Sequence, residues 1–550
     1  MDRRTLLAIG LMLVVALIPA LLSPNRRRAE TPPAAADTAA VAAADTVQAV
    51  VSPPPAELSV EEAPRPAAPD TEAAEHFVTV ESPLYRFRFS TRGGRLVGAE
   101  LKQYKTFAVG DTGNARIIPP DSRFLETALV FGTDTVSLAG WDFEPSAERV
   151  EVDRAGADLR LLARRGNVTV ALTYTFAPDV YLFDVEGQVT GVTSGGMALV
   201  SLGPRLSLVE ADSVDDFRSY AVVTKNGGTE RLNFRSLDPG ETRAFEGPFE
   251  WVAMKSKYFV ATVLAVGEDQ PRFGGAVAVG GQRSGRNATR ADVVTSLPAP
   301  GGHFSFSAYV GPQDYKRLSH IGHKLEDLNS YGWIFRPVIQ PFANLIVVVL
   351  LWMHQNLNMA YGWVLILFGL AVRVVLWPLN QKAMRSSMAM QAVQPELKAV
   401  QERYKQDPQK MQQEVMKLYK EHGVNPLGGC LPMLIPMPVL FALFFVFRVT
   451  IEFRGVPFLW LPDLSRADPY YIIPVVMGLS MFAVSKIGQL GVPPNPQAKM
   501  MVYVMPAFLT FIFLKLSSGL NLYYAVSNIA SIPQQWMIAR QRLQRLGRRE

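Results

Sequence analysis

Arg373 is the residue whose type and position could act chemically inside a membrane. It lies several residues from either end of an apolar run from Tyr361 to Pro378. A charge at that depth costs a few kcal/mol or more unless it faces water or a partner, and the later apolar runs contain no acidic residue. Two interpretations remain open. The guanidinium reaches the headgroups near Trp377, or it faces a hydrated cavity.

Polar side chains recur at helical spacing on the last two apolar runs. In the last run, steps of three and four residues separate Asn521, Tyr524, Asn528, Ser531 and Gln535; in the preceding run, steps of seven separate Tyr503, Thr510 and Ser517. Such stripes could hold helices together. Beside an unpaired arginine they favour the lining of a groove. A positive groove open to the cytoplasm would attract an acidic or polar peptide segment while a neighbouring apolar segment enters lipid.

The sequence predicts no enzymatic activity, no cofactor and no metal site. Up to Pro312 it contains only the histidines His76 and His303, no cysteine and no glycine-rich phosphate loop. His320 and His323 would need more partners to hold a metal. Because the sequence has no nucleotide-binding motif, the energy for moving a peptide into the membrane must come from burial of that peptide's apolar segment and from the membrane potential.

The composition excludes several classes of protein. With 49% hydrophobic and 19% charged residues, the chain is neither disordered throughout nor collagen-like. A single cysteine, Cys430, excludes an intramolecular disulfide, so any extracytoplasmic domain must rely on its core. The charge of +6 is modest, and the positions of the basic residues decide its meaning.

The N-terminal residues predict a membrane anchor followed by a tether. Residues 1–28 contain an apolar run from Leu6 to Leu22 flanked by arginines, and no small-x-small cleavage site precedes Arg26. We therefore expect an uncleaved transmembrane anchor. Residues 29–75 are rich in proline, alanine and acid, which predicts a disordered, anionic periplasmic tether.

Residues 76–312 have the pattern of an antiparallel β-sandwich. Tyr85, Phe87 and Phe89 alternate with arginines before a turn at 91–94. The alternation returns over 170–176 and, after the Pro178-Asp179 turn, over 181–185. Period-two runs separated by turns predict strands with one buried face.

Residues 313–356 have a helical pattern. Asp314 to Leu328 predicts one amphipathic helix, with apolar residues at helical spacing. Phe342 to Met353 is a short apolar run, of a length more typical of an interfacial or buried helix than of a membrane span. We expect residues 313–356 to lie along the membrane surface.

Five further spans, with the anchor, predict six transmembrane helices. They occupy 357–380, 426–449, 471–488, 500–516 and 517–538, joined by a 381–425 hairpin, a 450–470 periplasmic loop and a 489–499 cytoplasmic loop. The hairpin and the 539–550 tail are basic, so the positive-inside rule makes them cytoplasmic. Both termini are then cytoplasmic, and the β-rich domain is periplasmic.

The cytoplasmic stretch predicts a helical hairpin. Asp407-Pro408 is an N-cap followed by proline at the first helical position, and Gly423 suits the end of the second helix. The apolar stripes of the two helices pack together. The basic outer face is solvated and could meet acidic lipid or ribosomal RNA phosphate. It includes Lys398, Arg403, Lys405, Lys410 and Lys417.

Several motifs resemble those of the YidC/Oxa/Alb insertases. In the membrane region they are Val424–Pro432 followed by Met437-Pro438, Val372-Arg373 with Trp377-Pro378-Leu379, Asp468–Pro474, and Ser518–Asn528. Trp251–Phe259 and Tyr309–Pro312 are similar to the periplasmic domain of the Gram-negative branch.

This resemblance implies a fold, a function and partners. The fold would be a polytopic α-helical membrane protein with a large periplasmic all-β, galactose-mutarotase-like supersandwich. The function would be that of a bacterial inner-membrane insertase and chaperone for nascent membrane proteins, alone or with the Sec translocon. The groove arginine of the family falls on Arg373, and its client-contacting tyrosines fall on Tyr523 and Tyr524.

The chain departs from the family pattern at three positions. Pro436 stands where many members have glutamine, Gly369 where threonine is common, and Lys515 near the outer end of its span is unusual. Two other classes of protein stay open as alternatives. One is a transporter or channel that uses Arg373, although the sequence has no internal repeat. The other is an anchored periplasmic carbohydrate-binding protein.

Overall fold

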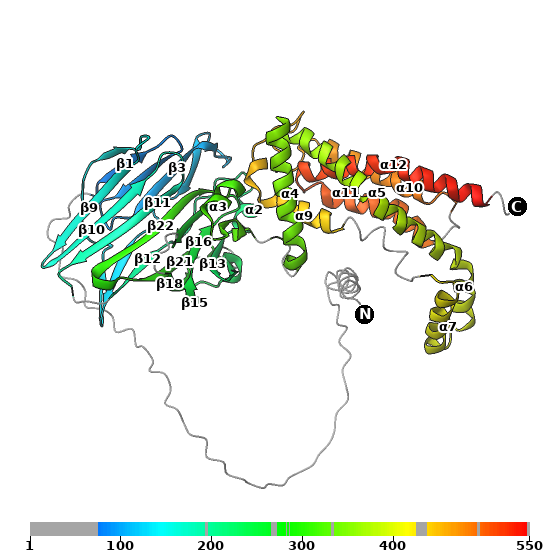
Figure 1. The fold of residues 1–550 in the computed structure, drawn as a ribbon, viewed down its shortest axis with the longest axis horizontal. Coiled ribbons are helices and arrows are strands. Elements are labelled where there is room, and N and C mark those ends of the chain that lie inside the picture. Colours follow the sequence, from blue (N-terminus) through cyan, green and yellow to red (C-terminus); the bar gives the residue numbers. More distant parts are fainter. Residues whose placement is uncertain are drawn as a thin grey trace, which may run out of the picture. The chain divides into compact units, whose positions relative to one another are not determined.

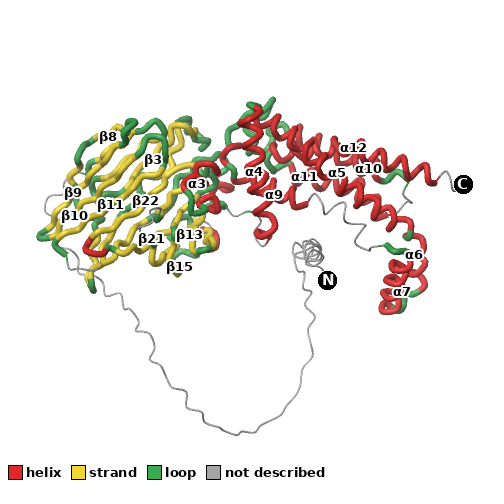
Figure 2. The backbone as a smooth tube through the Cα atoms, viewed as in Figure 1, coloured by secondary structure: helices red, strands yellow, loops and turns green. Residues whose placement is uncertain are grey.

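The computed structural model describes residues 75–192, 196–265, 272–281, 283–284, 287–329, 331, 335–424, 437–491 and 496–546. The anchor at 1–28, all of the tether except residue 75, and Pro436 lie outside these ranges. The first part of the described chain is built of strands and the second of helices (Figures 1 and 2).

The largest sheet has nine strands, and its neighbours pair in antiparallel register. In sheet order they are β14 (Gly228–Asn233), β13 (Ala221–Asn226), β16 (Trp251–Lys255), β17 (Phe259–Leu264), β22 (His303–Pro312), β11 (Leu182–Thr190), β10 (Val168–Phe176), β9 (Ala157–Arg165) and β7 (Glu144–Pro145). β22 is the last strand of the domain in sequence, and it lies in the middle of this nine-stranded sheet.

Smaller sheets complete the β domain. The six-stranded sheet contains β15 (Thr242–Phe249), β18 (Phe273–Gly280), β21 (Ala291–Pro298), β12 (Gly196–Ser201), β5 (Thr127–Phe131) and β6 (Asp134–Ser137). The five-stranded sheet contains β4 (Asn114–Ile118), β3 (Leu96–Lys105), β2 (Tyr85–Ser90), β1 (Phe77–Glu81) and β8 (Arg149–Glu151), with β1 and β8 parallel. β19 (Arg283–Ser284) and β20 (Asn287–Ala288) form a two-stranded ribbon.

The predicted alternation of buried and exposed residues is confirmed in β2 and β10. Tyr85, Phe87 and Phe89 are fully buried, whereas the arginines between them are exposed. The Tyr85 and Phe87 rings stack 3.9 Å apart. Tyr174 of β10 joins the same core and donates its hydroxyl proton to the Gly94 carbonyl at 2.7 Å. Aromatic packing thus supplies the core of a domain that has no disulfide.

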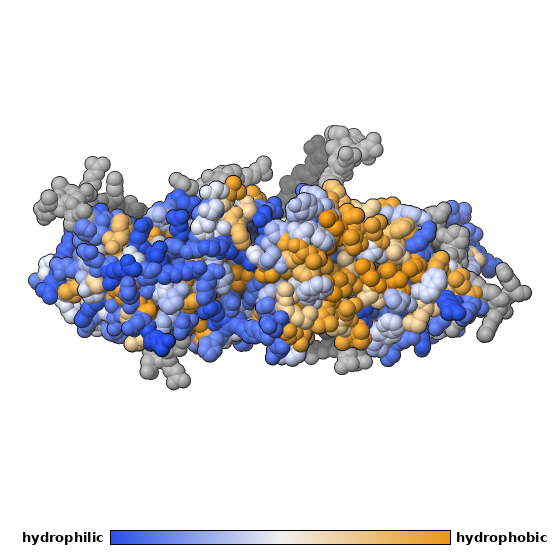
Figure 3. All heavy atoms as spheres, turned by 90° about the horizontal axis from the view of Figure 1, so that it is seen from above, coloured by the Kyte–Doolittle hydropathy of each residue, from blue (hydrophilic) through white to orange (hydrophobic). Residues whose placement is uncertain are grey.

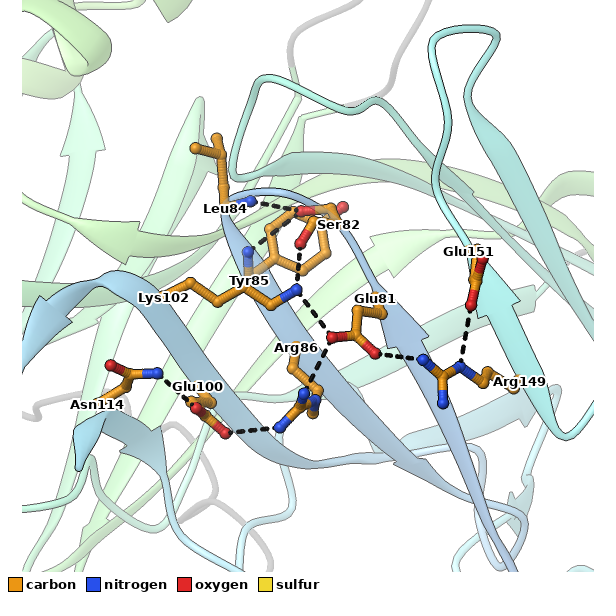
Figure 4. A network of polar contacts seen from close by, with 10 residues as sticks. All are labelled: Glu81, Ser82, Leu84, Tyr85, Arg86, Glu100, Lys102, Asn114, Arg149 and Glu151. Carbon is orange, nitrogen blue, oxygen red and sulfur yellow. Dashed lines mark hydrogen bonds and ion pairs between the residues drawn. The ribbon is translucent and has the colours of Figure 1, made fainter.

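Glu81 joins the strands of the five-stranded sheet through ion pairs (Figure 4). Its carboxylate accepts from Arg86 of β2 at 2.9 Å, Lys102 of β3 at 2.8 Å and Arg149 of β8 at 2.9 Å. Hydrogen bonds from Lys102 and Arg86 lower the pKa of Glu81 to about 2. Arg86 also reaches Glu100 of β3, which accepts from Asn114 of β4 at 2.8 Å, so the network extends across all five strands of this sheet.

The predicted single helix from Asp314 to Leu328 is wrong in its length. Asp314 caps a short helix, α3 (Tyr315–Ile321), through the Arg317 amide. Gly322 then takes a φ of +88°, which ends the helix, and a 3-10 turn follows at Leu325–Leu328. A positive φ cannot continue a right-handed helix. The β domain also carries one short helix, α2 (Ser213–Phe217).

The apolar run at 342–353 belongs to a longer helix than the sequence predicted. α4 (Arg336–Leu357) has 22 residues and starts ahead of the run, because Pro337 suits a first helical turn. By length and composition alone, α4 and the segment Tyr361–Met390 could each cross a membrane. Length therefore does not distinguish a surface position for α4 from a span.

The remaining helices follow the predicted spans with changes at their ends. They are α5 (Tyr361–Ala392), α6 (Gln394–Arg403), α7 (Pro408–Glu421), α9 (Met437–Val449), α10 (Ile472–Gly488), α11 (Pro496–Phe513) and α12 (Ser518–Leu546). α5 continues through Pro378 and α12 through Pro533. α5 therefore extends beyond residue 380, where the sequence predicted the end of the span, and the internal proline does not end the helix.

The helices form a second hydrophobic core. α12 packs against α10 and α5, α4 packs against α9, and α10 packs against α11. Large hydrophobic side chains are also exposed on this part of the chain, as the orange residues of Figure 3 show. They include Trp352, Val374, Val375, Leu479 and Phe511. An exposed apolar surface of this kind suits contact with lipid.

Candidate functional site

Arg373 lies on α5 where this helix meets α12. The side chain is partly buried, and its Nε atom is buried with no hydrogen-bond partner in the described part of the chain. Tyr523 of α12 is near enough to interact with the guanidinium electrostatically. A buried N–H without a partner is unfavourable, so this position suits an incoming acceptor or water.

Gly369, one turn before Arg373, is a point of close approach between the two helices. A Cβ atom added there would lie 3.4 Å from the Tyr523 ring and 3.4 Å from a Val526 methyl group. A threonine at this position would need more room than that Cβ alone. The added Cβ alone would make ordinary van der Waals contact, so the packing of α12 does not by itself require a glycine at this position.

Tyr523 and Tyr524 form an aromatic cluster with residues of the neighbouring helices. The Tyr523 ring lies 5.9 Å from that of Phe368 on α5, and the Tyr524 ring lies 5.3 Å from that of Phe513 on α11. Tyr523 is buried at 5% exposure, whereas Tyr524 is partly exposed. Tyr524 is therefore the more accessible of the two hydroxyl-bearing rings.

Asn521 binds the end of α11 through its Nδ2 atom, while its Oδ1 atom is buried with no hydrogen-bond partner in the described part of the chain. Its side chain is fully buried, and Nδ2 donates to the Phe513 carbonyl at 3.0 Å and to the Leu516 and Ser517 carbonyls at 3.4 and 3.3 Å. These carbonyls end α11 and begin the link to α12. The contacts favour a role in fixing that corner.

Asn528 and Thr510 also make contacts within the helical core. Asn528 donates to the Ser480 hydroxyl of α10 at 3.3 Å, and Thr510 donates to the Pro506 carbonyl of its own helix at 2.7 Å. The structure thus brings Arg373, Tyr523 and Tyr524 together, whereas Asn521 links α12 to the end of α11, Asn528 links α12 to α10, and Thr510 bonds within α11. Interhelical bonding is the other role that such stripes have in membrane proteins.

The buried aspartate Asp468, known from the sequence only as part of a family motif, is a structural residue beside the start of α10. It accepts from the amides of Tyr470 and Ile473 at 3.0 and 2.8 Å and so holds the turn that leads into α10, whose N-cap position is Tyr471. Trp460 donates to the same carboxylate at 3.3 Å. The Asp468-Pro469 pair predicts a helix that starts at Pro469, whereas α10 starts at Ile472, so this pattern places the helix start only approximately.

The basic stretch between α5 and α9 contains two helices, α6 and α7, which pack together as a hairpin. Asp407 accepts from the Lys410 amide at 3.0 Å, Pro408 opens α7, and Gly423 has a φ of +59° beyond its end. Val393 and Leu418 are buried. The five basic residues of the predicted outer face, Lys398, Arg403, Lys405, Lys410 and Lys417, are exposed.

The basic tail contributes one structural contact. Arg542 of α12 donates to the carbonyls of Gly488 and Leu490 at 2.9 and 3.0 Å, where α10 ends. A cation at a helix C-terminus satisfies free carbonyls and opposes the helix dipole. Within the described ranges, no three or more His, Cys, Asp or Glu side chains gather in a way that could hold a metal ion.

Comparisons with known proteins cover both parts of the chain. Residues 352–545 match the family described as 60Kd inner membrane protein, and residues 77–345 match the YidC periplasmic domain. The membrane protein insertase YidC of Chlorobaculum parvum is 30% identical over 532 residues, which is 88% of this chain and 88% of that protein. The one of Oleidesulfovibrio alaskensis is 32% identical over 511 residues, covering 90% of this chain and 92% of that protein.

A solved structure of an active YidC insertase has 18% identity and a TM-score of 0.33, covering 84% of this chain and 95% of that chain. The matches to the family and to the curated relatives span the β domain and the helices alike. The chain belongs to the YidC family of inner-membrane proteins, with the periplasmic domain of that family.

Proposed function

We propose that this protein is a membrane protein insertase and chaperone whose clients enter the bilayer past Arg373. The family assignment supports the activity. The observation that carries the site is the buried Arg373 Nε, which has no partner in the described part of the chain. A polar client segment can supply the missing acceptor while its apolar neighbour moves into lipid.

In this proposal, Arg373 and Tyr524 face the client, with Tyr523 behind them. The guanidinium lowers the cost of bringing an acidic or polar segment into the membrane. Tyr524 offers an apolar ring with a polar tip to the passing chain. Asn521, Asn528 and Thr510 keep α10, α11 and α12 in place around these residues.

The proposed topology has six transmembrane helices, the N-terminal anchor included, with both termini in the cytoplasm and a β-supersandwich in the periplasm. α5, α9, α10, α11 and α12 span, and α4 lies at the membrane surface. The number of membrane crossings between the β domain and the hairpin supports this position of α4. If α4 also crossed, the β domain and the lysine-rich hairpin would lie on the same side, against the positive-inside rule.

The exposed basic residues of the hairpin are the proposed contact for the ribosome and for anionic lipid. Phosphate attracts lysine and arginine without needing a defined sequence. Partnership with the Sec translocon rests on family resemblance alone. We propose no small-molecule substrate, no cofactor and no enzymatic reaction.

Site-specific crosslinking tests the groove. A photoreactive residue at Tyr524, and others flanking Arg373, should form adducts with a nascent small membrane protein on ribosomes. The matched control is the same probe at Phe511, an exposed residue of α11 outside the proposed site. Adducts no stronger at Tyr524 than at Phe511 would refute the groove.

Arg373 substitutions test the role of charge. Arg373→Ala should impair clients that carry polar or acidic segments, and Arg373→Lys should be milder because it keeps the charge. Equal loss in both variants would mean that geometry beyond charge is required. Solute flux through liposomes without any client would favour a transporter instead.

A further inference from the structure

The loop between α9 and α10 contributes to both hydrophobic cores of the described chain. Ile451, at the start of a 3-10 turn, is buried in the core of the β domain. Phe453, two residues later, is buried in the core of the helices. We call residues 448–455 the bridge segment. Because Ile451 and Phe453 are only two residues apart, a shift of one of them out of its core would also displace the other.

Arg454 is a charged residue of the bridge segment whose side chain is almost fully buried. Its side chain is 3% exposed, and its Nε lies 2.6 Å from Oε1 of Glu210, whose side chain is 11% exposed. Nη2 donates to the Lys105 carbonyl at 2.8 Å. Both acceptors belong to the β domain. Such an ion pair has little solvent to replace it if either partner is removed.

Aromatic rings of the β domain surround the same guanidinium. The Arg454 Cζ lies 4.3 Å from the centre of the Phe107 ring and 5.3 Å from that of Phe259. Gly455 has a φ of +70°, and an added Cβ would lie 2.8 Å from Phe107, so the close approach depends on the glycine. Planar stacking on rings together with a forked set of donors is a use to which lysine is not suited.

Two outer contacts support the bridge segment. Arg448, at the end of α9, lies 3.2 Å from Asp215, which Lys257 also holds at 2.9 Å. Glu452 accepts from the amide of Tyr315, the first residue of α3, at 3.1 Å. The bridge segment is thus held to the β domain by charge, by backbone bonds and by apolar packing.

The rest of the loop is tied to the helix that carries the tyrosine cluster. The amide of Ser518, the first residue of α12, donates to the Arg466 carbonyl at 2.7 Å, and its hydroxyl donates to the Asp463 carbonyl at 3.1 Å. Phe458 packs against Gly362 near the start of α5. The loop therefore contacts both helices that bring Arg373 and Tyr523 together.

We infer that Arg454 is a positioning residue that fastens the β domain to the outer ends of α5 and α12. It acts through the loop and touches no client. The β domain and the helices then move as one body, so a movement of the β domain also moves the start of α12. Domains joined only by a linker move freely relative to each other by default. The contacts of Arg454 with the β domain restrict this motion.

The test measures the distance between the β domain and the helices in lipid nanodiscs. Spin labels are placed at Val109, which is 91% exposed, and at Lys515, also exposed, in a Cys430→Ser background. The protein with Arg454 intact should give a narrow distance distribution. Arg454→Ala should broaden it about twofold, as for an unclamped domain. Arg466→Ala, an exposed arginine of the same loop, should leave it narrow.

Glu210→Gln keeps the shape of the partner and removes its charge, so it decides the result if Arg454→Ala fails to fold. It should broaden the distribution as well, and the double variant should be no broader than Arg454→Ala alone. A native-width distribution in a folded Arg454→Ala or Glu210→Gln protein would overturn the inference, as would a broad distribution with Arg454 intact. The distances do not depend on insertase activity. They can therefore be interpreted even if the tests of the proposed function fail.

Discussion

Replacing Asn521 by alanine separates a structural role from a groove role. The side chain gives one good hydrogen bond and two longer ones to carbonyls where α11 ends. A side-chain bond between membrane helices is worth about 0.6 kcal/mol on average and up to about 1.7 kcal/mol. The Phe513 and Ser517 carbonyls keep backbone donors, the amides of Leu516 and Asn521, so they add no penalty for an unsatisfied acceptor. We therefore expect Asn521→Ala to lower the free energy of unfolding by about 1–2 kcal/mol.

The assay is reversible unfolding in mixed micelles, combined with crosslinking of clients from position 524 per folded molecule. Asn528→Ala is the matched control. It loses one bond of 3.3 Å from a partly exposed side chain and should cost less than about 1 kcal/mol. The reasoning fails if Asn521→Ala unfolds like the parent protein but loses its client adducts, because Asn521 would then act on the client.

Three further predictions concern packing and charge. Burial raises the pKa of Asp216 to about 7, so the folded state keeps a proton that the unfolded chain releases near pH ~4. Stability is then greatest below that pH and falls as pH rises through about 7; Asp216→Asn should remove this fall in melting temperature. Glu81→Gln should cost the β domain about 1–2 kcal/mol at neutral pH, because three partly exposed cations lose their partner. The pKa of Glu81 is lowered, so this stabilisation should vanish as pH falls through about 2, and a cost that persists there would contradict the ion-pair account. A Cβ added at Gly478 would lie 2.0 Å from the Thr510 hydroxyl, so Gly478→Ala should destabilise the helices by about 1–3 kcal/mol. Adding Thr510→Ala should restore part of the loss in the same unfolding assay, and no rescue would place the strain elsewhere.

Local patterns predicted the elements that local interactions determine. Alternation placed the buried aromatic residues of β2 and β10, and Asp407-Pro408 placed the start of α7. Asp314 was correctly placed at a helix start, but the end of that helix depended on the backbone at Gly322. A 3.6-residue pattern continues through such a break, since the apolar residues on both sides pack into the same core.

The role of each polar residue depended on contacts that spacing alone cannot give. The α12 stripe does lie on one helical face, yet Asn521 and Asn528 meet different neighbours on that face. Arg454 was not singled out at all, because an arginine in a polar loop has no periodic signal. Its partner Glu210 is far away in sequence, and only the folded chain brings the two together.

Burial of Ile451 in the β-domain core has a consequence for biosynthesis. Its strands are complete once β22 has emerged at Pro312, but Ile451 is made later, after α4, α5, the hairpin and α9. At about 5–20 residues per second, the domain waits of order ten seconds for this side chain. During that time the growing chain carries a folded domain with one apolar position uncovered, and docking of the loop closes it only when the next helix pair is being synthesised.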